Sequence, residues 1–134
     1  MIVADTNIIA YCVIESEWTT RAVSLNKADS HWVVPRLWRS ELCNLLATAM
    51  RNRVMKLEDA VLAFRYADTL IGDNEYNVDP ARVLELAEAS GCTAYDCEFV
   101  SLAEKLSVPL VTADKRLVSA FPDIAISLTN FASS

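Results

Sequence analysis

Apolar residues along the chain follow two patterns, short continuous runs and longer stretches with helical spacing. Short runs bounded by polar or turn-forming residues predict strands, and recurrence every three or four positions predicts helices. The predicted strands are 1–4, 31–35, 109–112 and 124–128. The predicted helices are about 8–13, 18–27, 36–52, 57–71, 80–90, 93–106 and 115–121.

The alternation of short strands with helices predicts an α/β fold. Strands that are apolar throughout are typical of a parallel sheet with helices on both faces. We therefore expect a three-layer α/β/α architecture around a central, mainly parallel sheet of about four to five short strands. No repeat, low-complexity stretch or linker interrupts the pattern, so we expect a single domain over residues 1–134.

The composition is that of a chain with a substantial core. Hydrophobic residues make up 53% of the 134 residues and only 2 are glycine, which argues against disorder and repeat architectures. No apolar run approaches the roughly 20 residues of a membrane span. The N-terminus has an acid at position 5 and lacks the basic segment of a signal peptide. These features predict a cytoplasmic protein with no membrane partner.

The cysteines, Cys12, Cys43, Cys92 and Cys97, lie in apolar, helix-like contexts and form no CxxC pair. A disulfide framework is not expected in a chain with a good core and no export signal. A thiolate zinc site needs closely paired ligands, and His31 is the only histidine. We therefore predict buried, reduced thiols.

Two carboxylates are predicted at the carboxyl ends of strands, where open parallel sheets bind their ligands. Asp5 follows the strand 1–4 directly, and Asp114 follows the strand 109–112 after one residue. Either could instead serve only as the N-cap of the next helix, which is a common role of aspartate. The placement of both at strand ends is the first indication of a functional site.

Two further carboxylates are predicted at the inward edges of helices. Glu41 falls about 60° from Trp38 on a helical wheel, beside an apolar stripe, where an unpaired carboxylate is costly. An ion pair with arginine is the alternative explanation. Asp96 borders the apolar stripe of its helix, whereas Glu98 is predicted to point the other way. Asp96 also fits a capping box with Thr93, so a purely structural role stays open.

Together these four carboxylates predict a metal site. Held within about 5 Å, each pair would repel by about 3 kcal/mol at an effective dielectric constant near 20, so the cluster needs cations or shared protons. Oxygen ligands favour hard ions, Mg²⁺ or Mn²⁺, over zinc. Such ions can activate water and stabilise a phosphodiester during in-line displacement. The predicted catalytic and metal-binding residues are Asp5, Glu41, Asp96 and Asp114.

The motifs around these acids resemble those of PIN-domain ribonucleases, particularly the small VapC-type toxins of toxin–antitoxin pairs. VADTNIIAY at 3–11 resembles the family's first motif, and RSEL at 39–42 resembles the second. Residues 93–117, TAYDCEFVSLAEKLSVPLVTADKRL, resemble the third and fourth motifs and are the most specific part. The resemblance covers essentially the whole chain and implies a PIN-like fold.

The resemblance also implies a role for each acid. Asp5 and Asp96 would be the principal metal ligands, and Glu41 would orient the metal or the water. Asp114 would support a second ion or its bound waters. Secondary candidates at neighbouring polar positions are Asn7 and Thr112. The implied activity is Mg²⁺- or Mn²⁺-dependent hydrolysis of phosphodiester bonds within single-stranded RNA, leaving 5′-phosphate and 3′-hydroxyl ends. A homodimer and a small antitoxin whose tail blocks the site are implied as well.

The net charge of −6 fits RNA binding poorly, although basic residues gather between positions 36 and 65. The candidate RNA contacts are Arg36, Arg39, Arg51, Arg53, Lys115 and Arg116. These side chains could equally belong to solvated helix faces. Trp18, Trp32 and Trp38 could stack on bases, but core or dimer packing explains Trp32 and Trp38 better.

Two alternative functions remain open. A phosphoaspartate receiver or a phosphatase would also place an aspartate after the first strand. However, the Asp-x-Asp pair of such phosphatases is replaced by Asp5 and Asn7, and the strand 31–35 ends without a phosphoacceptor. The other alternative is a catalytically silent PIN-like module that binds RNA or protein, against which the intact set of acids argues.

Overall fold

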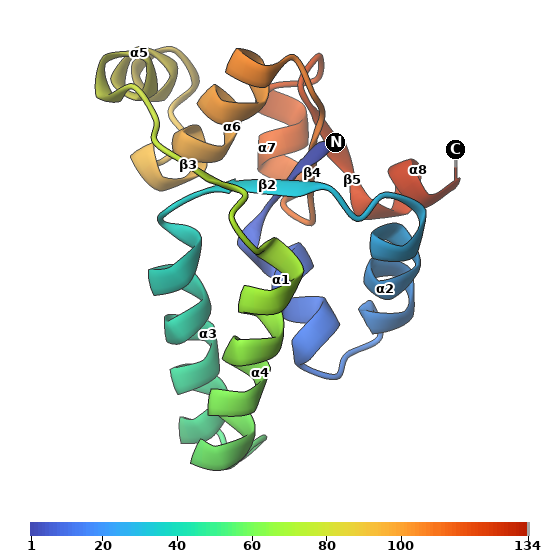
Figure 1. Ribbon diagram of the computed structural model, residues 1–134. Coiled ribbons are helices and arrows are strands. Elements are labelled where there is room, and N and C mark those ends of the chain that lie inside the picture. Colours follow the sequence, from blue (N-terminus) through green and yellow to red (C-terminus); the bar gives the residue numbers. More distant parts are fainter. Residues whose placement is uncertain (134) are drawn as a thin grey trace.

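The computed structural model describes residues 1–133, and Figure 1 shows the order of their elements. The strands are β1 (Ile2–Ala4), β2 (Trp32–Pro35), β3 (Glu75–Tyr76), β4 (Leu110–Thr112) and β5 (Ala125–Ser127). The helices are α1 (Thr6–Val13), α2 (Thr19–Ala28), α3 (Trp38–Arg51), α4 (Leu57–Ile71), α5 (Pro80–Ser90), α6 (Ala94–Leu106), α7 (Lys115–Ala120) and α8 (Leu128–Ser133).

The strands form a parallel sheet in the order β3-β2-β1-β4-β5. The central strand is β1, in which Val3 lies opposite Val33 of β2 and Leu110 of β4. Strands β1 and β4 come from opposite ends of the chain, yet their carboxyl ends meet at one edge of the sheet. The predicted α/β fold with a central parallel sheet is therefore confirmed.

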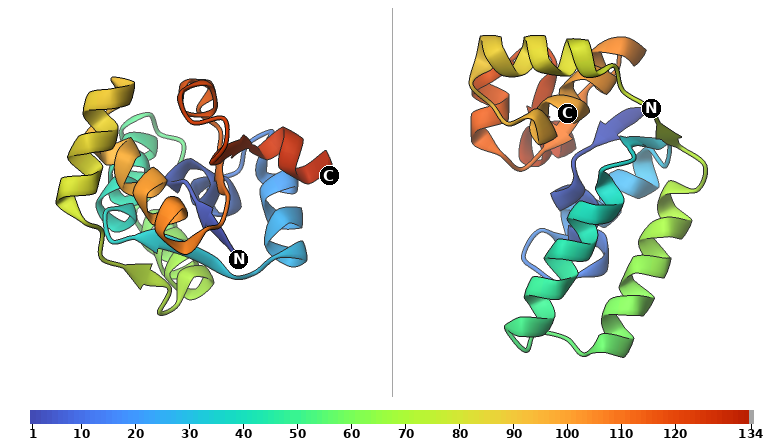
Figure 2. Two further views of the ribbon diagram at one scale, coloured as in Figure 1. Left: turned by 90° about the horizontal axis from the view of Figure 1, so that it is seen from above. Right: turned by 90° about the vertical axis from the view of Figure 1, so that its left-hand side faces the viewer.

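Helices cover both faces of the sheet. Helices α5, α6 and α7 lie above it in the view of Figure 1, and α1, α3 and α4 lie below it. The two views of Figure 2 show that α3 and α4 form an antiparallel pair that projects away from the sheet. Helix α6 packs on β1 and β2, and α1 packs on α3 and α4. This is the predicted three-layer arrangement.

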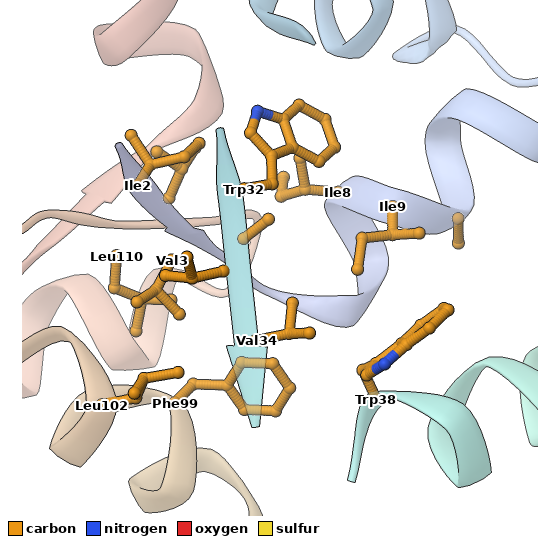
Figure 3. Close-up of a cluster of buried hydrophobic side chains, with 14 of the residues drawn as sticks. Ile2, Val3, Ile8, Ile9, Trp32, Val34, Trp38, Phe99, Leu102 and Leu110 are labelled. Atoms are coloured by element: carbon orange, nitrogen blue, oxygen red, sulfur yellow. The ribbon is translucent and has the colours of Figure 1, made fainter. Parts of the chain in front are cut away.

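The core lies on both sides of the sheet. Figure 3 shows Trp32 beside Ile8 of α1, and Val3 and Leu110 on the side of Phe99 from α6. Each of these five side chains is at most 1% exposed. Because β1, β2 and β4 are buried on both faces, their sequences are continuous apolar runs and do not alternate.

Two elements, β3 and α8, were not predicted. Strand β3 has only two residues, Glu75 and Tyr76, and the sequence contains no apolar run at this position that would predict a strand. It is extended because it pairs with the end of β2 and because the guanidinium of Arg39 binds the carboxylate of Glu75. The predicted strand 124–128 ends one residue early, since the hydroxyl of Ser127 accepts a hydrogen bond from the Asn130 N–H and so starts α8.

All four cysteines are free, but the prediction that they are buried is right only for Cys97. Cys12 and Cys92 are partly buried, and Cys43 is exposed. Cys43 follows the core residue Leu42 on α3, and one helical step of about 100° turns its thiol to the solvent. No helix within residues 1–133 is long and apolar enough to cross a membrane.

Candidate active site

Asp5 lies at the junction of β1 and α1 and is 8% exposed. Its N–H donates to the carbonyl of Val111 at 3.0 Å, which places it beside the end of β4. Its Oδ1 accepts the N–H of Thr6 at 2.8 Å, and its Oδ2 accepts the hydroxyl of Thr112 at 2.7 Å. Asp5 is therefore both the N-cap of α1 and a buried carboxylate at the strand ends.

Glu41 lies in the first turn of α3 and is half-buried. Its Oε1 accepts the hydroxyl of Thr6 at 2.7 Å, which joins α3 to α1. The ion pairs formed by residues 1–133 do not include Glu41, so the alternative of an arginine partner is wrong. Among residues 1–133, the Glu41 carboxylate therefore has a hydroxyl partner but no ion-pair partner.

Asp114 is the N-cap of α7, and its Oδ1 accepts the N–H of Arg116 at 2.8 Å. The guanidinium of Arg116 lies 3.6 Å from Oδ2. The N–H of Asp114 donates to the hydroxyl of Thr112 at 3.0 Å, and that hydroxyl in turn donates to Asp5. Thr112, which is 0% exposed, thus ties the two strand-end acids together.

Asp96 lies in the first turn of α6, and its backbone N–H donates to the hydroxyl of the N-cap Thr93 at 3.1 Å. The cap uses the backbone of Asp96, which leaves its carboxylate available to the pocket. That pocket has a volume of about 170 Å³ and is lined by Asp5, Thr6, Asn7, Glu41, Asn44, Leu45, Asp96 and Asp114. The structure therefore brings all four predicted acids, with Asn7, into one place.

The electrostatics of this acid pocket disfavour negative charge. Burial raises the pKa of Asp5, with a further contribution from the charges of Asp96 and Asp114, and the hydrogen bonds from Thr112 and Thr6 oppose this only in part. Burial also raises the pKa of Glu41, as do the charges of Asp5, Asp96 and Glu98. A cation would relieve this repulsion directly.

The pocket offers carboxylate, hydroxyl and amide groups to a metal ion, and its lining contains neither cysteine nor histidine. As the side chains stand, residues 1–133 contain no group of three or more His, Cys, Asp or Glu that could hold an ion directly. Mg²⁺ usually retains several waters and takes only one or two carboxylates. The residues therefore fit a hydrated hard ion, held partly through water, and do not fit zinc.

Sequence reasoning missed two polar members of this pocket, Thr6 and Asn44. Thr6 supplies the hydroxyl that holds Glu41, and its position within the Asp5–Asn7 motif was the available signal. Asn44 lines the pocket three residues after Glu41, on the same face of α3. Glu98, which was predicted to point away from the stripe that Asp96 borders, is not part of the pocket lining, although its charge makes the smallest of the contributions that raise the pKa of Glu41.

The basic candidates fall into two groups. Arg39 binds Glu75 and Asp68 and lies over the Trp38 ring, so it serves the fold at the β3 edge. Arg36 donates to Asn77 near the same edge. The exposed pair Arg51 and Arg53 lies at the far end of α3.

Lys115 and Arg116 are placed differently. They line a cavity of about 480 Å³ together with Asp96 and with residues 90–93. Of the six basic candidates, these two therefore share a cavity with an acid of the pocket.

The geometry of strand-end acids in a three-layer parallel fold agrees with a family-level comparison. The sequence model of the PIN domain matches residues 2–123. The chain belongs to the PIN-domain family. Members of this family are generally nucleases, and they are distinct from the receiver and phosphatase classes considered as an alternative.

Solved structures show the same PIN fold. PAE2754 from Pyrobaculum aerophilum has a TM-score of 0.71 at 19% identity, over 99% of this chain and 96% of that chain. FitAcB from Neisseria gonorrhoeae has a TM-score of 0.71 at 19% identity, over 96% and 99% of the two chains. A toxin–antitoxin complex from Klebsiella pneumoniae has a TM-score of 0.68 at 15% identity, over 96% and 98%. No curated protein matches the sequence of this PIN domain.

Proposed function

We propose that this PIN domain is a metal-dependent endoribonuclease that uses Mg²⁺ or Mn²⁺ to hydrolyse phosphodiester bonds in single-stranded RNA. The observation that carries the proposal is the acid pocket, in which four carboxylates gather at the ends of β1 and β4. Burial and mutual repulsion raise the pKa of Asp5 and Glu41. Of the four acids in the pocket, only Asp114 has a cation partner among the ion pairs of residues 1–133, so the pocket is suited to a cation from outside the protein.

Each polar side chain of the pocket has a definite part in the proposed mechanism. Asp5 and Asp96 would hold the ion, which lowers the pKa of a bound water and stabilises the charge that develops on the phosphate. Thr112 fixes the orientation of Asp5 through its hydrogen bond to Oδ2. Asp114 would bind a second ion or its waters, and Asn7 would contact the same waters.

Glu41 is suited to accept the proton of the attacking water. Its Oε1 is occupied by the hydroxyl of Thr6, so Oε2 is the atom that would take the proton. Its raised pKa brings it closer to neutral pH, where a general base works best. Thr6 holds this carboxylate in position through that hydrogen bond.

The biological role proposed here is that of the toxin in a toxin–antitoxin pair. One structural neighbour is a toxin–antitoxin complex, and another is FitAB bound to a DNA fragment. We propose that this chain likewise binds a small protein antitoxin, forms a homodimer and is located in the cytoplasm. Detection of a short DNA-binding reading frame beside the gene, and of a complex between its product and this chain, would support the role. A gene without such a neighbour would argue against it.

The first test of the activity is removal of the metal. Single-stranded RNA incubated with the purified protein should be cut in Mg²⁺ or Mn²⁺ and remain intact in excess EDTA, and restored Mg²⁺ should restore cutting. The product ends should be 5′-phosphate and 3′-hydroxyl, measured by end labelling. Cutting that survives EDTA would contradict the proposed chemistry and indicate another nuclease in the sample.

Thr112→Val should lower the rate of RNA cleavage by roughly 10- to 100-fold, the usual cost of losing a group that orients a metal ligand. Valine keeps the shape of threonine but removes the donor to Asp5 and the acceptor of the Asp114 N–H. Thr112→Ser retains the hydroxyl and should recover most of the rate. Equal rates for the valine and serine variants would show that the hydroxyl has no part in orienting Asp5.

A further inference from the structure

A third cavity lies beside the acid pocket, and Thr112 is part of its lining. It has a volume of about 290 Å³ and is lined by Tyr11, Trp18, Thr112, Ala113, Lys115, Ser127, Leu128 and Thr129. These residues come from α1, the residue before α2, the end of β4, the first residue of α7 and the β5–α8 junction. We call it the aromatic cavity.

Two aromatic rings form part of its wall. The ring centroids of Tyr11 and Trp18 are 6.4 Å apart, and the ring planes make an angle of 32°. The guanidinium of Arg21 lies over the Trp18 ring, 5.2 Å from its centroid, and donates to the hydroxyl of Thr129 at 3.1 Å. Arg21 thus connects two residues of the lining, with its guanidinium on one face of the indole.

Trp18 differs from the other two tryptophans of the chain. Trp32 and Trp38 are each 0% exposed and belong to the core. Trp18 is only partly buried. A large ring left open beside polar groups is a feature of ligand sites more than of cores.

The aromatic cavity is joined to the acid pocket by shared residues. The hydroxyl of Thr112, which lines the aromatic cavity, is the group that donates to Asp5. Lys115 lines the aromatic cavity and also the 480 Å³ cavity that contains Asp96. A single-stranded RNA bound across the acids would therefore contact the ammonium group of Lys115 and the aromatic rings next to Thr112.

The size and chemistry of the cavity select its occupant. At about 290 Å³ it is at the small end of ligand pockets, which start at roughly 300 Å³, so it suits one flat ring system and not a folded peptide segment. Aromatic walls stack on bases of any sequence, and a neighbouring lysine neutralises a phosphate. Thr129 and Ser127 also line the cavity, and their hydroxyls accept hydrogen bonds from Arg21 and from the Asn130 N–H.

We propose that the aromatic cavity binds one unstacked base of the single-stranded RNA substrate, next to the phosphodiester that lies over the acid pocket. This inference rests on the proposed nuclease function and adds a base-binding subsite to it. The base stacks against Trp18 and Tyr11, and Lys115 binds the phosphate that follows. Duplex RNA does not reach the subsite, because its bases are already stacked on one another.

Tryptophan fluorescence tests the subsite without turnover. Of the three tryptophans, Trp18 is partly exposed, whereas Trp32 and Trp38 are buried in the core. A base stacked on Trp18 should therefore quench the emission of Trp18 and leave that of Trp32 and Trp38 unchanged. Single-stranded RNA added to the Asp96→Asn protein should quench saturably, whereas duplex RNA of the same sequence should not. The same titration with Asp96→Asn/Trp18→Phe should show no change. Absence of quenching by single-stranded RNA would overturn the inference.

Kinetics provide the second test, in the otherwise unmodified protein. Trp18→Leu should raise KM for single-stranded RNA by roughly 5- to 150-fold, the range expected for one stacked base, with a smaller change in kcat. Trp18→Phe keeps an aromatic face and should recover most of the affinity. Tyr66→Leu is the matched control, because Tyr66 is an aromatic residue of α4 that is 54% exposed outside this cavity.

The two tests separate failure of the subsite from failure of the proposed activity. Cleavage by the wild-type protein with an unchanged KM for Trp18→Leu would reject the subsite and leave the nuclease proposal intact. Saturable quenching without any cleavage by the wild-type protein would reject the nuclease proposal and support base binding. Quenching by an abasic oligonucleotide equal to that by normal RNA would also reject the subsite, since no base would then be needed.

Discussion

Asp96→Asn should reduce the rate of RNA cleavage by about 1,000-fold, which corresponds to about 4 kcal/mol of lost transition-state stabilisation. Asparagine has nearly the same shape but carries no charge, so it binds Mg²⁺ or Mn²⁺ poorly. The fold should be unaffected, because α6 is capped by a hydrogen bond from the backbone N–H of this residue to Thr93. Cleavage is measured with single-stranded RNA under saturating Mg²⁺.

The matched control for this change is Asp59→Asn. Asp59 is also an aspartate in the first turn of a helix, on α4, and it is exposed. Its variant should cut RNA at the wild-type rate. Asp96 is a cleaner choice than Asp5, whose two carboxylate oxygens both accept hydrogen bonds that hold β1, β4 and α1 together. If Asp96→Asn stays within tenfold of the wild type, Asp96 is not a principal metal ligand.

Glu41→Gln should stabilise the protein in the absence of metal near neutral pH. The amide oxygen of glutamine can still accept the hydroxyl of Thr6, while the repulsion from Asp5 and Asp96 disappears. The pocket is open to solvent, so we take the gain near the screened value of about 1 kcal/mol, or roughly 3–5 °C in Tm for a chain of this length. Thermal unfolding in EDTA measures it, with Glu58→Gln in the first turn of α4 as the neutral control.

The pH dependence of this effect has a definite sign. Burial raises the pKa of Glu41 above its ordinary value of 4.5, so the folded state holds the proton more tightly than the unfolded state does. As pH rises from about 4.5 through the raised pKa, the wild type therefore loses free energy of unfolding. Below that window both states are protonated, and the two proteins should unfold at nearly the same temperature. An advantage of the variant that persists at low pH would contradict this explanation.

Metal should reverse the order of the two proteins. An ion that binds only the folded state adds about 2.7 kcal/mol when its concentration is 100 times its Kd. The wild type should gain this stabilisation, and Glu41→Gln should gain clearly less, because one of the carboxylates facing the ion is gone. Equal gains in Mg²⁺ would place the ion away from Glu41.

The sequence was sufficient to predict the sheet and the acids because both depend on local patterns. Residues 1–4 form an apolar run that stops at Asp5, and such a run becomes a strand buried on both faces. The same logic located Asp114 after β4, and helical spacing placed Glu41 and Asp96 at inward edges. The predicted caps were also correct for Asp5 and Asp114, whose carboxylates face the pocket as well.

The features that were not predicted depend on contacts between distant residues. β3 is a strand only because β2 and the guanidinium of Arg39 lie next to it. The basic residues show the same limit, since Arg39 is held in ion pairs with acids far along the chain.

The pairing of β1 with β4 determines when the acid pocket can form during synthesis of the chain. β1 is synthesised first, yet the backbone partner of Asp5 is Val111 and the hydroxyl that orients it comes from Thr112. Long-range parallel pairings of this kind form late in folding, after the loops between them have closed. A nascent chain that lacks β4 therefore cannot assemble the acid pocket. Ribosomes that carry the partly made protein would be spared its nuclease activity until synthesis is almost finished.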